Sequence, residues 1–388
     1  MKLTKNISFK YFKEIKKDKN LSNLLSKIKN ENNQIIKSLS GNYKDSFSKK
    51  KVSKYKKYSN VRLIGMGGSS LGAQSIYDFL QHKVKKNFLF INNLATTKKI
   101  SNNKKNSLNL IISKSGNTLE TIANSNLFLS KNQKNIFITQ NKKSYLRTLA
   151  NELKSEVFAH NNFIGGRYSV LSEVGMLPAT LMGLNPKKFR RFNKLIKNKR
   201  FVESLITNVS NIFSLYKQKK FNSVILNYDE RSTNLFYWYQ QLVAESLGKK
   251  SKGLLPVVST MPKDNHSLMQ FYLDGIKNNF FTFFFVEDKL NNKIQNKFLL
   301  KSHKYLKSKD LNHIKKSQFV AKENIFKKNK IPFRSFYVNQ RNEESLGELF
   351  TFFILETILL GKLMNINPYD QPAVELIKNE TKKTLTKF

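Results

Sequence analysis

The stretch "VRLIGMGGSSLGAQSIYDFL", from Val61 to Leu80, joins a short apolar run, a turn rich in glycine and serine, and a helical segment. Short apolar runs bounded by turn residues are typical of buried strands. A strand followed by such a turn and a helix is the repeating unit of a parallel sheet with crossover helices. The stretch therefore predicts an α/β fold in which the turns after the strands carry the function.

The same alternation continues along the chain in two series. The first series continues with "NFLFIN", "LNLIIS" and "NIFITQ", which are also typical of buried strands. A second series begins near Phe221, with the strand candidates "SVILNY", "FFTFFFVE" and "FRSFYVN" and the helix candidates "STNLFYWYQQLVAESLG" and "EESLGELFTFFILETILLGKLM". We expect a helical connection from Pro186 to Lys220. The sequence thus predicts two α/β lobes, each with a parallel sheet flanked by helices.

Bulk composition narrows the class of protein. A chain of 388 residues is long enough for two cores. It contains no Cys, which excludes disulfides and thiolate chemistry. The charged start "MKLTKNISFKYFKEIKKDKN" lacks the apolar core of a signal peptide, and no uncharged run reaches the roughly 18 residues of a membrane span. We therefore expect a cytoplasmic protein without membrane contact.

The formal net charge of +44 at pH 7 raises the question of nucleic-acid binding. A nucleic-acid surface needs Lys and Arg concentrated on one face, with aromatic or amide side chains that contact bases. Here Lys is scattered among Asn, Ile and Phe along the whole chain, so we do not predict nucleic-acid binding. A basic field still attracts small anions and speeds their encounter with the protein.

The turn "IGMGGSSLG" has the residues of a ligand-binding turn. Its glycines let the backbone approach a ligand, and Ser69 and Ser70 offer hydroxyls at a helix start, where free N–H groups favour an anion. A P-loop would require Lys where Ala73 stands, and a dinucleotide site would require an acidic residue near Asn92. The turn therefore favours a small phosphate or a sugar. The alternative is a tight turn that needs glycine for its backbone alone.

A second turn of this kind lies in "LNLIISKSGNTLETIAN". Ser113, Ser115 and Thr118 each offer a hydroxyl, and Lys114 adds a positive charge. Several donors near a helix N-terminus suit a phosphate monoester dianion. The alternative is an ordinary helix N-cap with additional Ser and Thr. Two turns of this kind after strands of one sheet favour an anion-binding site over ordinary helix caps.

Three further side chains have candidate catalytic roles. Arg167, which follows two glycines in "GGRYSVLSEVG", is either a clamp on backbone carbonyls or a cation that faces developing negative charge. Glu245 lies near a helix end whose dipole disfavours a carboxylate, which suits a general base; the alternative is a surface pair with Lys249. His266 is either a proton carrier or a plain surface histidine. The other histidines lack ligand spacing, so no metal site is predicted.

The motifs together resemble those of the glucose-6-phosphate isomerase (phosphoglucose isomerase) family. In order, they are "IGMGGSSLG", "SKSGNTLET", "GGRYSVLSEVG", "QQLVAESLGK", "DNHSLMQ" and "NPYDQPAVELIK", over residues 60–378. The resemblance implies sugar-isomerase-type lobes in a homodimer. It also implies reversible conversion of glucose 6-phosphate to fructose 6-phosphate, in glycolysis and gluconeogenesis, without metal or cofactor. The expected regions are an N-terminal helical extension (1–55), a first lobe with the phosphate-binding turns (56–200), a second lobe (201–365) and a C-terminal segment that closes over the site (366–388).

The resemblance also implies a role for each site residue. Glu245 matches the base that moves a proton between C1 and C2 through a cis-enediol, and Arg167 matches the residue that stabilises the enediolate. His266, reaching in from the second subunit, and Lys378 match the pair that helps to open the sugar ring. The phosphate-binding residues form a larger set: Ser113, Lys114, Ser115 and Thr118, with Gly68 and Ser69 from the first turn.

The chain departs from the family pattern at Asn265, Ala373 and Ile377, close to two of these residues. Two other functions stay open. One is a dual phosphoglucose and phosphomannose isomerase, which turnover of mannose 6-phosphate would reveal. The other is a non-catalytic sugar-phosphate-binding protein. The presence of Glu245, Arg167, His266 and Lys378 together disfavours the second, because phosphate binding alone needs no proton-transfer groups.

Overall fold

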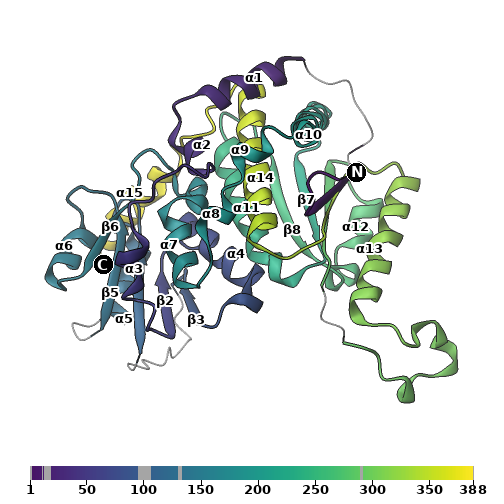
Figure 1. Cartoon of the computed structure of the whole chain (residues 1–388). Coiled ribbons are helices and arrows are strands. Elements are labelled where there is room, and N and C mark those ends of the chain that lie inside the picture. Colours follow the sequence, from purple (N-terminus) through teal and green to yellow (C-terminus); the bar gives the residue numbers. More distant parts are fainter. Residues whose placement is uncertain are drawn as a thin grey trace.

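The computed structural model describes residues 2–10, 12, 19–94, 106–129, 133–288 and 292–387. The end of "FINNLATT" and part of the charged N-terminal start lie outside these residues. Two α/β lobes stand side by side (Figure 1). The fold class that the apolar runs predicted is confirmed.

Two five-stranded sheets are present in the described part of the chain. The first has the order β3-β2-β4-β5-β6, with every pairing parallel. Its strands are β2 (Asn60–Ile64), β3 (Asn87–Ile91), β4 (Ser107–Ile112), β5 (Lys134–Thr139) and β6 (Glu156–Ala159). The second has the order β1-β10-β9-β7-β8. Its strands are β1 (Ile7–Lys10), β7 (Asn222–Asn227), β8 (Leu255–Thr260), β9 (Asn279–Val286) and β10 (Phe333–Val338).

Helices cover the sheets and connect the two lobes. The α-helices up to the first lobe's end are α1 (Lys19–Asn30), α2 (Gln34–Ser38), α3 (Lys49–Ser53), α4 (Leu71–Phe79), α5 (Leu119–Phe128), α6 (Tyr145–Glu152) and α7 (Glu173–Leu181). The predicted helical connection consists of α8 (Pro186–Phe189), α9 (Phe192–Leu195) and α10 (Lys199–Lys217). The remaining α-helices are α11 (Thr233–Leu247), α12 (Met269–Asp274), α13 (Leu311–Lys328), α14 (Glu343–Leu363) and α15 (Val374–Leu385).

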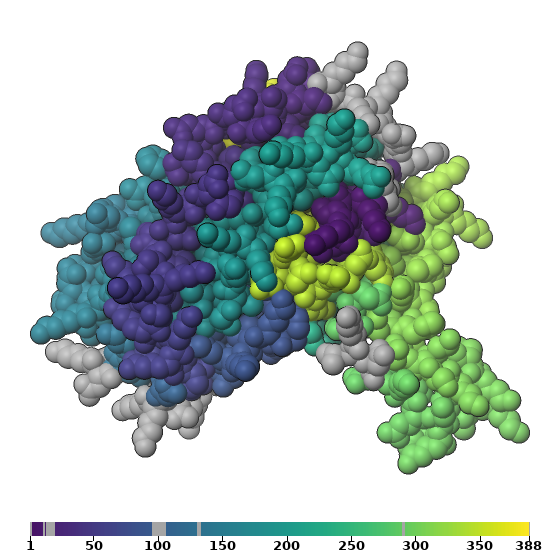
Figure 2. Space-filling view, viewed as in Figure 1, coloured from purple at the N-terminus to yellow at the C-terminus, as the bar shows by residue number. Residues whose placement is uncertain are grey.

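Short 3-10 turns follow several strands. They are η1 (Gly67–Ser69), η2 (Gln81–Lys83), η3 (Gly166–Leu171), η4 (Glu230–Ser232), η5 (Lys263–His266), η6 (Asn296–Phe298) and η7 (Lys301–Leu306). The segment that holds η6 and η7 projects from the second lobe (Figure 2). Within the described residues, no helix is both long and apolar enough to cross a lipid bilayer.

One hydrophobic core runs through both lobes. It contains Leu63 of β2 and Ile225 of β7, and almost every residue of α14 is buried within or beside it. In β9 the side chains alternate: Phe280 and Phe284 face this shared core, whereas Phe281 faces a second cluster on the other side of the sheet. Each buried Phe contributes roughly 1.5–3 kcal/mol to folding. The shared core joins the lobes into a single packed unit.

A buried ion pair ties the second sheet to α11, the helix that carries Glu245. The guanidinium of Arg334 pairs with the Glu356 carboxylate, and both side chains are fully buried. The Tyr239 hydroxyl, on α11, donates to Glu356 Oε1 at 2.9 Å. Removing one member of a buried pair typically costs about 3–5 kcal/mol. The contact therefore holds α11 against β10 and α14.

The helical pattern predicted for residues 1–55 is wrong for Ile7–Lys10, which form strand β1. This strand pairs antiparallel with β10, with Ile7 opposite Val338. Ile7 and Phe9 point into the core while Lys10 is exposed, as a period of two residues requires. Four residues in a Lys-rich segment give almost no sequence signal, and the partner strand lies more than 300 residues away, so the pairing depends on the complete fold.

Candidate active site

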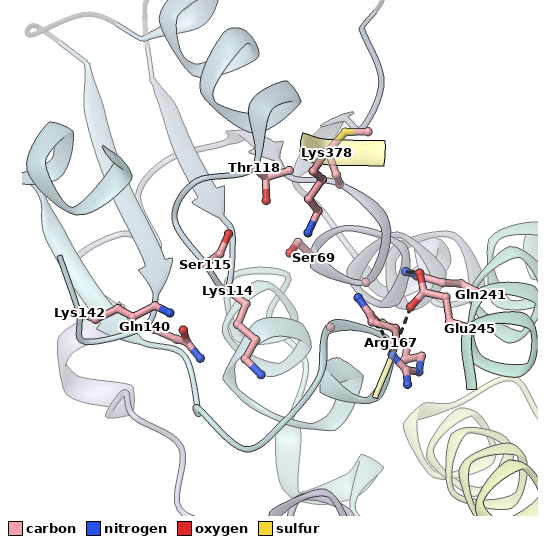
Figure 3. Close-up of a pocket in the computed structure, with 14 residues that line it drawn as sticks. Ser69, Lys114, Ser115, Thr118, Gln140, Lys142, Arg167, Gln241, Glu245 and Lys378 are labelled. Atoms are coloured by element: carbon pink, nitrogen blue, oxygen red, sulfur yellow. Dashed lines mark hydrogen bonds and ion pairs between the residues drawn. The ribbon is translucent and has the colours of Figure 1, made fainter. Parts of the chain in front are cut away.

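A cavity of about 430 Å³ opens at the carboxyl ends of β2, β4 and β5, where α11 of the second lobe meets the first sheet (Figure 3). This is the edge at which parallel sheets bind ligands. The residues that line the cavity are Met66, Gly68, Ser69, Lys114, Ser115, Thr118, Gln140, Lys142, Gly166, Arg167, Gln241, Glu245, Gln371 and Lys378. Among these described side chains four are cationic and only Glu245 is a carboxylate, so the cavity favours an anion.

The first turn brings Ser69 to the cavity wall and packs its glycines tightly. At Gly68 a Cβ would lie 2.1 Å from the backbone carbon of Gly166. The absence of a side chain therefore lets two backbone turns touch. Gly68 and Gly166 both line the cavity, so the backbone of Gly68 remains a candidate contact for a ligand, as the sequence predicted.

In the second turn, two hydroxyl residues line the cavity and a third lies behind them. Ser115 and Thr118 line the cavity. Ser113 is buried, lies 2.9 Å from Thr118 through their hydroxyl oxygens, and accepts a hydrogen bond from the Gly116 amide at 3.2 Å. The cavity wall within the described residues does not include Ser113. Thr118 also precedes α5, whose N-terminus adds a favourable dipole for an anion.

Lys114 belongs to a crowded group of cations. Burial lowers the pKa of its ammonium, and the charges of Lys142 and Arg167 lower that pKa further. Lys142 and Gln140 lie beyond β5 and face the cavity from the side opposite α11 (Figure 3). The sequence analysis did not single out these two residues. The usable signal was their position, since Gln140 ends "NIFITQ" and Lys142 follows two residues later, and the ends of neighbouring parallel strands meet at one edge.

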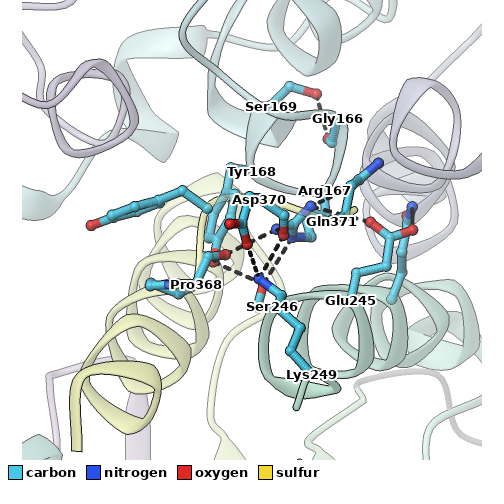
Figure 4. A network of polar contacts seen from close by, with 12 residues as sticks. Gly166, Arg167, Tyr168, Ser169, Glu245, Ser246, Lys249, Pro368, Asp370 and Gln371 are labelled. Carbon is cyan, nitrogen blue, oxygen red and sulfur yellow. Dashed lines mark hydrogen bonds and ion pairs between the residues drawn. The ribbon is translucent and has the colours of Figure 1, made fainter. Parts of the chain in front are cut away.

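Arg167 is 1% exposed and makes both kinds of contact that the sequence left open (Figure 4). Its Nη2 donates to the backbone oxygens of Pro368 and Asp370, each at 2.9 Å, and its Nε donates to Ser246 Oγ at 2.8 Å. Nη1 faces the cavity, where it bonds Gln371 Oε1 and lies 3.3 Å from Glu245 Oε2. The planar, five-donor guanidinium allows one side chain to hold the C-terminal segment and face the cavity together.

Glu245 lies on α11 between two partners. Its Oε2 faces Arg167, and its Oε1 accepts a hydrogen bond from Gln241 Nε2 at 2.9 Å. Gln241 is one turn earlier on the same helix and was missed in the sequence. The expected surface alternative, a pair with Lys249, does not form, because Lys249 binds Asp370 at 2.6 Å instead. The Glu245 side chain is 28% exposed and lines the cavity, so a ligand can reach it.

Of the two remaining predicted residues, one lines the cavity and the other does not. Lys378 of α15 lines the cavity, and its ammonium is 2.6 Å from Glu375. His266 ends η5 with an exposed side chain and is not among the described residues of the cavity wall. The structure of one chain therefore places Lys378 and Glu245 on the same cavity wall and leaves His266 outside it. Of the departures from the family pattern, Ala373 is the N-cap of α15 and Ile377 is 72% exposed on it.

The two α/β lobes, with hydroxyl turns, a cationic wall and one reachable carboxylate, define a sugar-phosphate isomerase. The phosphoglucose isomerase family model matches residues 16–261. The chain is 34% identical over 353 residues to the glucose-6-phosphate isomerase of Methanocaldococcus jannaschii, covering 86% of each chain. It is 33% identical over 356 residues to the enzyme of the same name from Mycoplasmopsis pulmonis, covering 84% of this chain and 82% of that one. The chain belongs to the phosphoglucose isomerase family.

Solved structures agree at the level of the fold. A hypothetical protein from Thermus thermophilus superposes with a TM-score of 0.82 at 24% identity, covering 94% of this chain and 93% of that one. A glucose-6-phosphate isomerase from Chlamydia trachomatis superposes with a TM-score of 0.70 at 19% identity, covering 87% of this chain and 72% of that one. Both likenesses extend across the two lobes.

Proposed function

We propose that this cavity carries out the reaction of its family, the reversible interconversion of glucose 6-phosphate and fructose 6-phosphate. The enzyme is an aldose–ketose isomerase. The observation that carries the assignment is the position of Glu245, the single carboxylate of the described cavity wall, against the Arg167 guanidinium and across from the hydroxyl turns. One base and one cation are what proton transfer next to a carbonyl requires.

In the proposed reaction Glu245 takes the proton from C2 of the open-chain aldose and returns it to C1. The electron pair released at C2 forms the C1–C2 double bond, and negative charge grows on the C1 oxygen. That oxygen takes up a proton to give the cis-enediol, and the C2 hydroxyl gives up its proton as C1 is protonated. Arg167 faces the cavity through Nη1 and stabilises that charge. Gln241 bonds one oxygen of the base and Arg167 bonds the other, so the two partners fix the orientation of the carboxylate. Lys378 and His266 are proposed to help open the sugar ring before this step.

The substrate's phosphate is proposed to bind Ser69, Ser115 and Thr118, with Lys114 supplying charge. Ser113 supports Thr118 rather than lining the cavity. We expect Ser115→Ala with Thr118→Ala to raise KM about 100-fold or more, because each of the two hydrogen bonds to a charged group contributes about 1.5–3 kcal/mol. The kcat value should change little, because the phosphate is not a reacting group. Steady-state kinetics with fructose 6-phosphate measure both values.

The matched control for this experiment is Glu120→Gln, on the first turn of α5 but outside the cavity wall. Its KM should stay within about twofold of wild type, as expected for a surface change. An unchanged KM in the double variant would remove the second turn from the phosphate site. A fall in kcat with unchanged KM would assign the two hydroxyls to the chemical step instead.

A homodimer is proposed because His266 lies outside the cavity of its own chain. If His266 of one subunit serves the site of the other, mixing Glu245→Gln with His266→Leu restores one complete site in each mixed dimer. Random reassembly should then give about a quarter of wild-type activity, because half of the dimers are mixed and each has one intact site. Co-refolding followed by the isomerase assay measures this recovery.

The same mixing experiment can exclude the homodimer arrangement. Each variant refolded alone is the control and should stay inactive. If the mixture also stays inactive while gel filtration shows mixed dimers, His266 acts within its own chain or not at all. A monomer in gel filtration would likewise contradict the proposal.

The alternatives are less favoured. The relatives that cover most of the chain are named glucose-6-phosphate isomerases, which does not favour a dual phosphoglucose and phosphomannose isomerase. A non-catalytic binding protein would have no use for Glu245 beside Arg167. We infer that the enzyme acts in the cytoplasm, because dianionic sugar phosphates do not cross lipid bilayers unaided. We also infer, from the reaction proposed above, that it serves glycolysis and gluconeogenesis.

A further inference from the structure

The segment between α14 and α15, residues 367–371, forms a strap along the edge of the cavity (Figure 4). Its last residue, Gln371, lines the cavity and bonds Arg167. Every described residue after Gln371 is exposed, including all of α15. Contacts of the strap with the body of the protein therefore determine where α15, and with it Lys378, lies.

Two sets of donors hold the strap. The inner set consists of Arg167 and Tyr168, which both donate to the Pro368 carbonyl at 2.9 Å. The outer set is a single side chain, Lys249. Its ammonium donates to the Asn367 carbonyl, to the Asp370 carbonyl at 2.6 Å and to Asp370 Oδ1 at 2.6 Å.

Lys249 has an unusual position for one of the many lysines of this chain. A lysine ammonium has three donors, and all three are directed at the strap. Its side chain is only 12% exposed, so it is immobilised. The hydrogen bond from Lys249 is also the main reason that the pKa of Asp370 is lowered. Since Lys249 follows α11 by two residues, the element that carries the base also anchors the strap.

We propose that Lys249 is a positioning residue for the isomerisation: it seats the strap and so holds Gln371 and Lys378 at the cavity beside Glu245. The proposal rests on the function proposed above for Lys378. Lys249 does not touch the reacting atoms. It acts by fixing the register of residues 367–371 from the outer edge. Arg167 and Tyr168 hold only the inner edge, where Tyr369 also packs on the Tyr168 ring.

The absence of Cys from the chain permits a chemical rescue experiment. In Lys249→Cys the strap loses its outer donors, and we expect kcat to fall about tenfold or more, since small displacements in a site cost up to about 10²-fold. The inhibition constant of inorganic phosphate should stay within about twofold, because the hydroxyl turns are on the first lobe. Alkylation of the new thiol with bromoethylamine rebuilds an ammonium of nearly lysine length and should restore kcat.

The matched control is Lys250→Cys, the next residue along, whose side chain is exposed. Its kcat should equal that of wild type before and after alkylation. Iodoacetamide, which adds no cation, should leave Lys249→Cys impaired. An unchanged kcat in Lys249→Cys, or no recovery with bromoethylamine, would overturn the positioning role. A phosphate inhibition constant that weakens in step with kcat would also overturn it, because that result indicates general disruption.

A second measurement reports the strap directly and does not depend on the role of Lys378. A nitroxide attached to Lys382→Cys on α15 should become more mobile when Lys249→Met is added and should not change with Lys250→Met. Unchanged mobility would overturn the seating role of Lys249. Lys378→Met separates the two proposals: normal turnover in that variant contradicts the function of Lys378, whereas the nitroxide spectra still decide whether Lys249 seats the strap.

Discussion

Glu245→Gln should retain the fold and sugar-phosphate binding but lose isomerisation by several orders of magnitude. The amide has the shape of the carboxylate; its oxygen can accept from Arg167, and its NH2 can donate to Gln241 once the Gln241 amide turns its oxygen inward. It cannot take a proton from C2. General-base catalysis contributes about 10²- to 10⁴-fold to rate, so we expect a loss of kcat within or above that range. A coupled assay of fructose 6-phosphate conversion measures it.

The control for this variant is Glu203→Gln, an exposed glutamate on α10 outside the cavity wall. It should turn over at the wild-type rate. Inorganic phosphate should bind both variants with the same affinity. Equal binding shows that the phosphate site has formed in each variant. Near-normal turnover in Glu245→Gln would remove this residue as the base and would leave the cavity without a carboxylate for the reaction among its described residues.

Arg167→Lys should lower both kcat and stability. A lysine cannot supply the guanidinium's fork, so it cannot bind Pro368, Asp370 and the cavity side together. Loss of a donor to developing negative charge costs about 10²–10³ in kcat. Each buried carbonyl left without a partner costs about 1–3 kcal/mol of folding free energy. Steady-state kinetics and thermal unfolding measure the two losses on one preparation.

Tyr168→Phe distinguishes the two roles of Arg167. It removes the hydroxyl that bonds Pro368 and Ser246, both of which Arg167 still binds, and leaves the cation in place. We expect a loss of about 1 kcal/mol in stability, with kcat less than tenfold reduced. If Arg167→Lys loses stability but keeps its kcat, Arg167 is only a clamp on the C-terminal segment and takes no part in stabilising the enediolate.

Elements with strong local patterns were predictable from the sequence. The central strands are continuous apolar runs because helices cover both faces of each sheet. The strands β6 and β8 were missed because their patterns are weak: β6 has only four residues with one buried position, and β8 contains Pro256 and mostly half-buried or exposed positions. Edge position alone is not the reason, because the edge strand β3 was predicted.

The candidate site was partly predictable for the same reason. The hydroxyl turns are recognisable from glycine and serine directly after a strand, and this depends on short-range backbone geometry. Gln241 could have been found as the residue one helical turn before Glu245. Gln140 and Lys142 have no composition signal, because polar residues after β5 resemble those of any surface loop.

The sequence by itself determined the strand-and-helix alternation, the two turns rich in glycine and serine, and the family, because each depends on residues close together in the chain. Only the tertiary structure decided which polar groups meet. Arg167 reaches Glu245 across 78 residues and Gln371 across 204. Lys249 turns away from Glu245 to the strap, and β1 joins the far lobe. Such pairings depend on how the whole chain closes, and local patterns contain no information on which buried donor will find which acceptor.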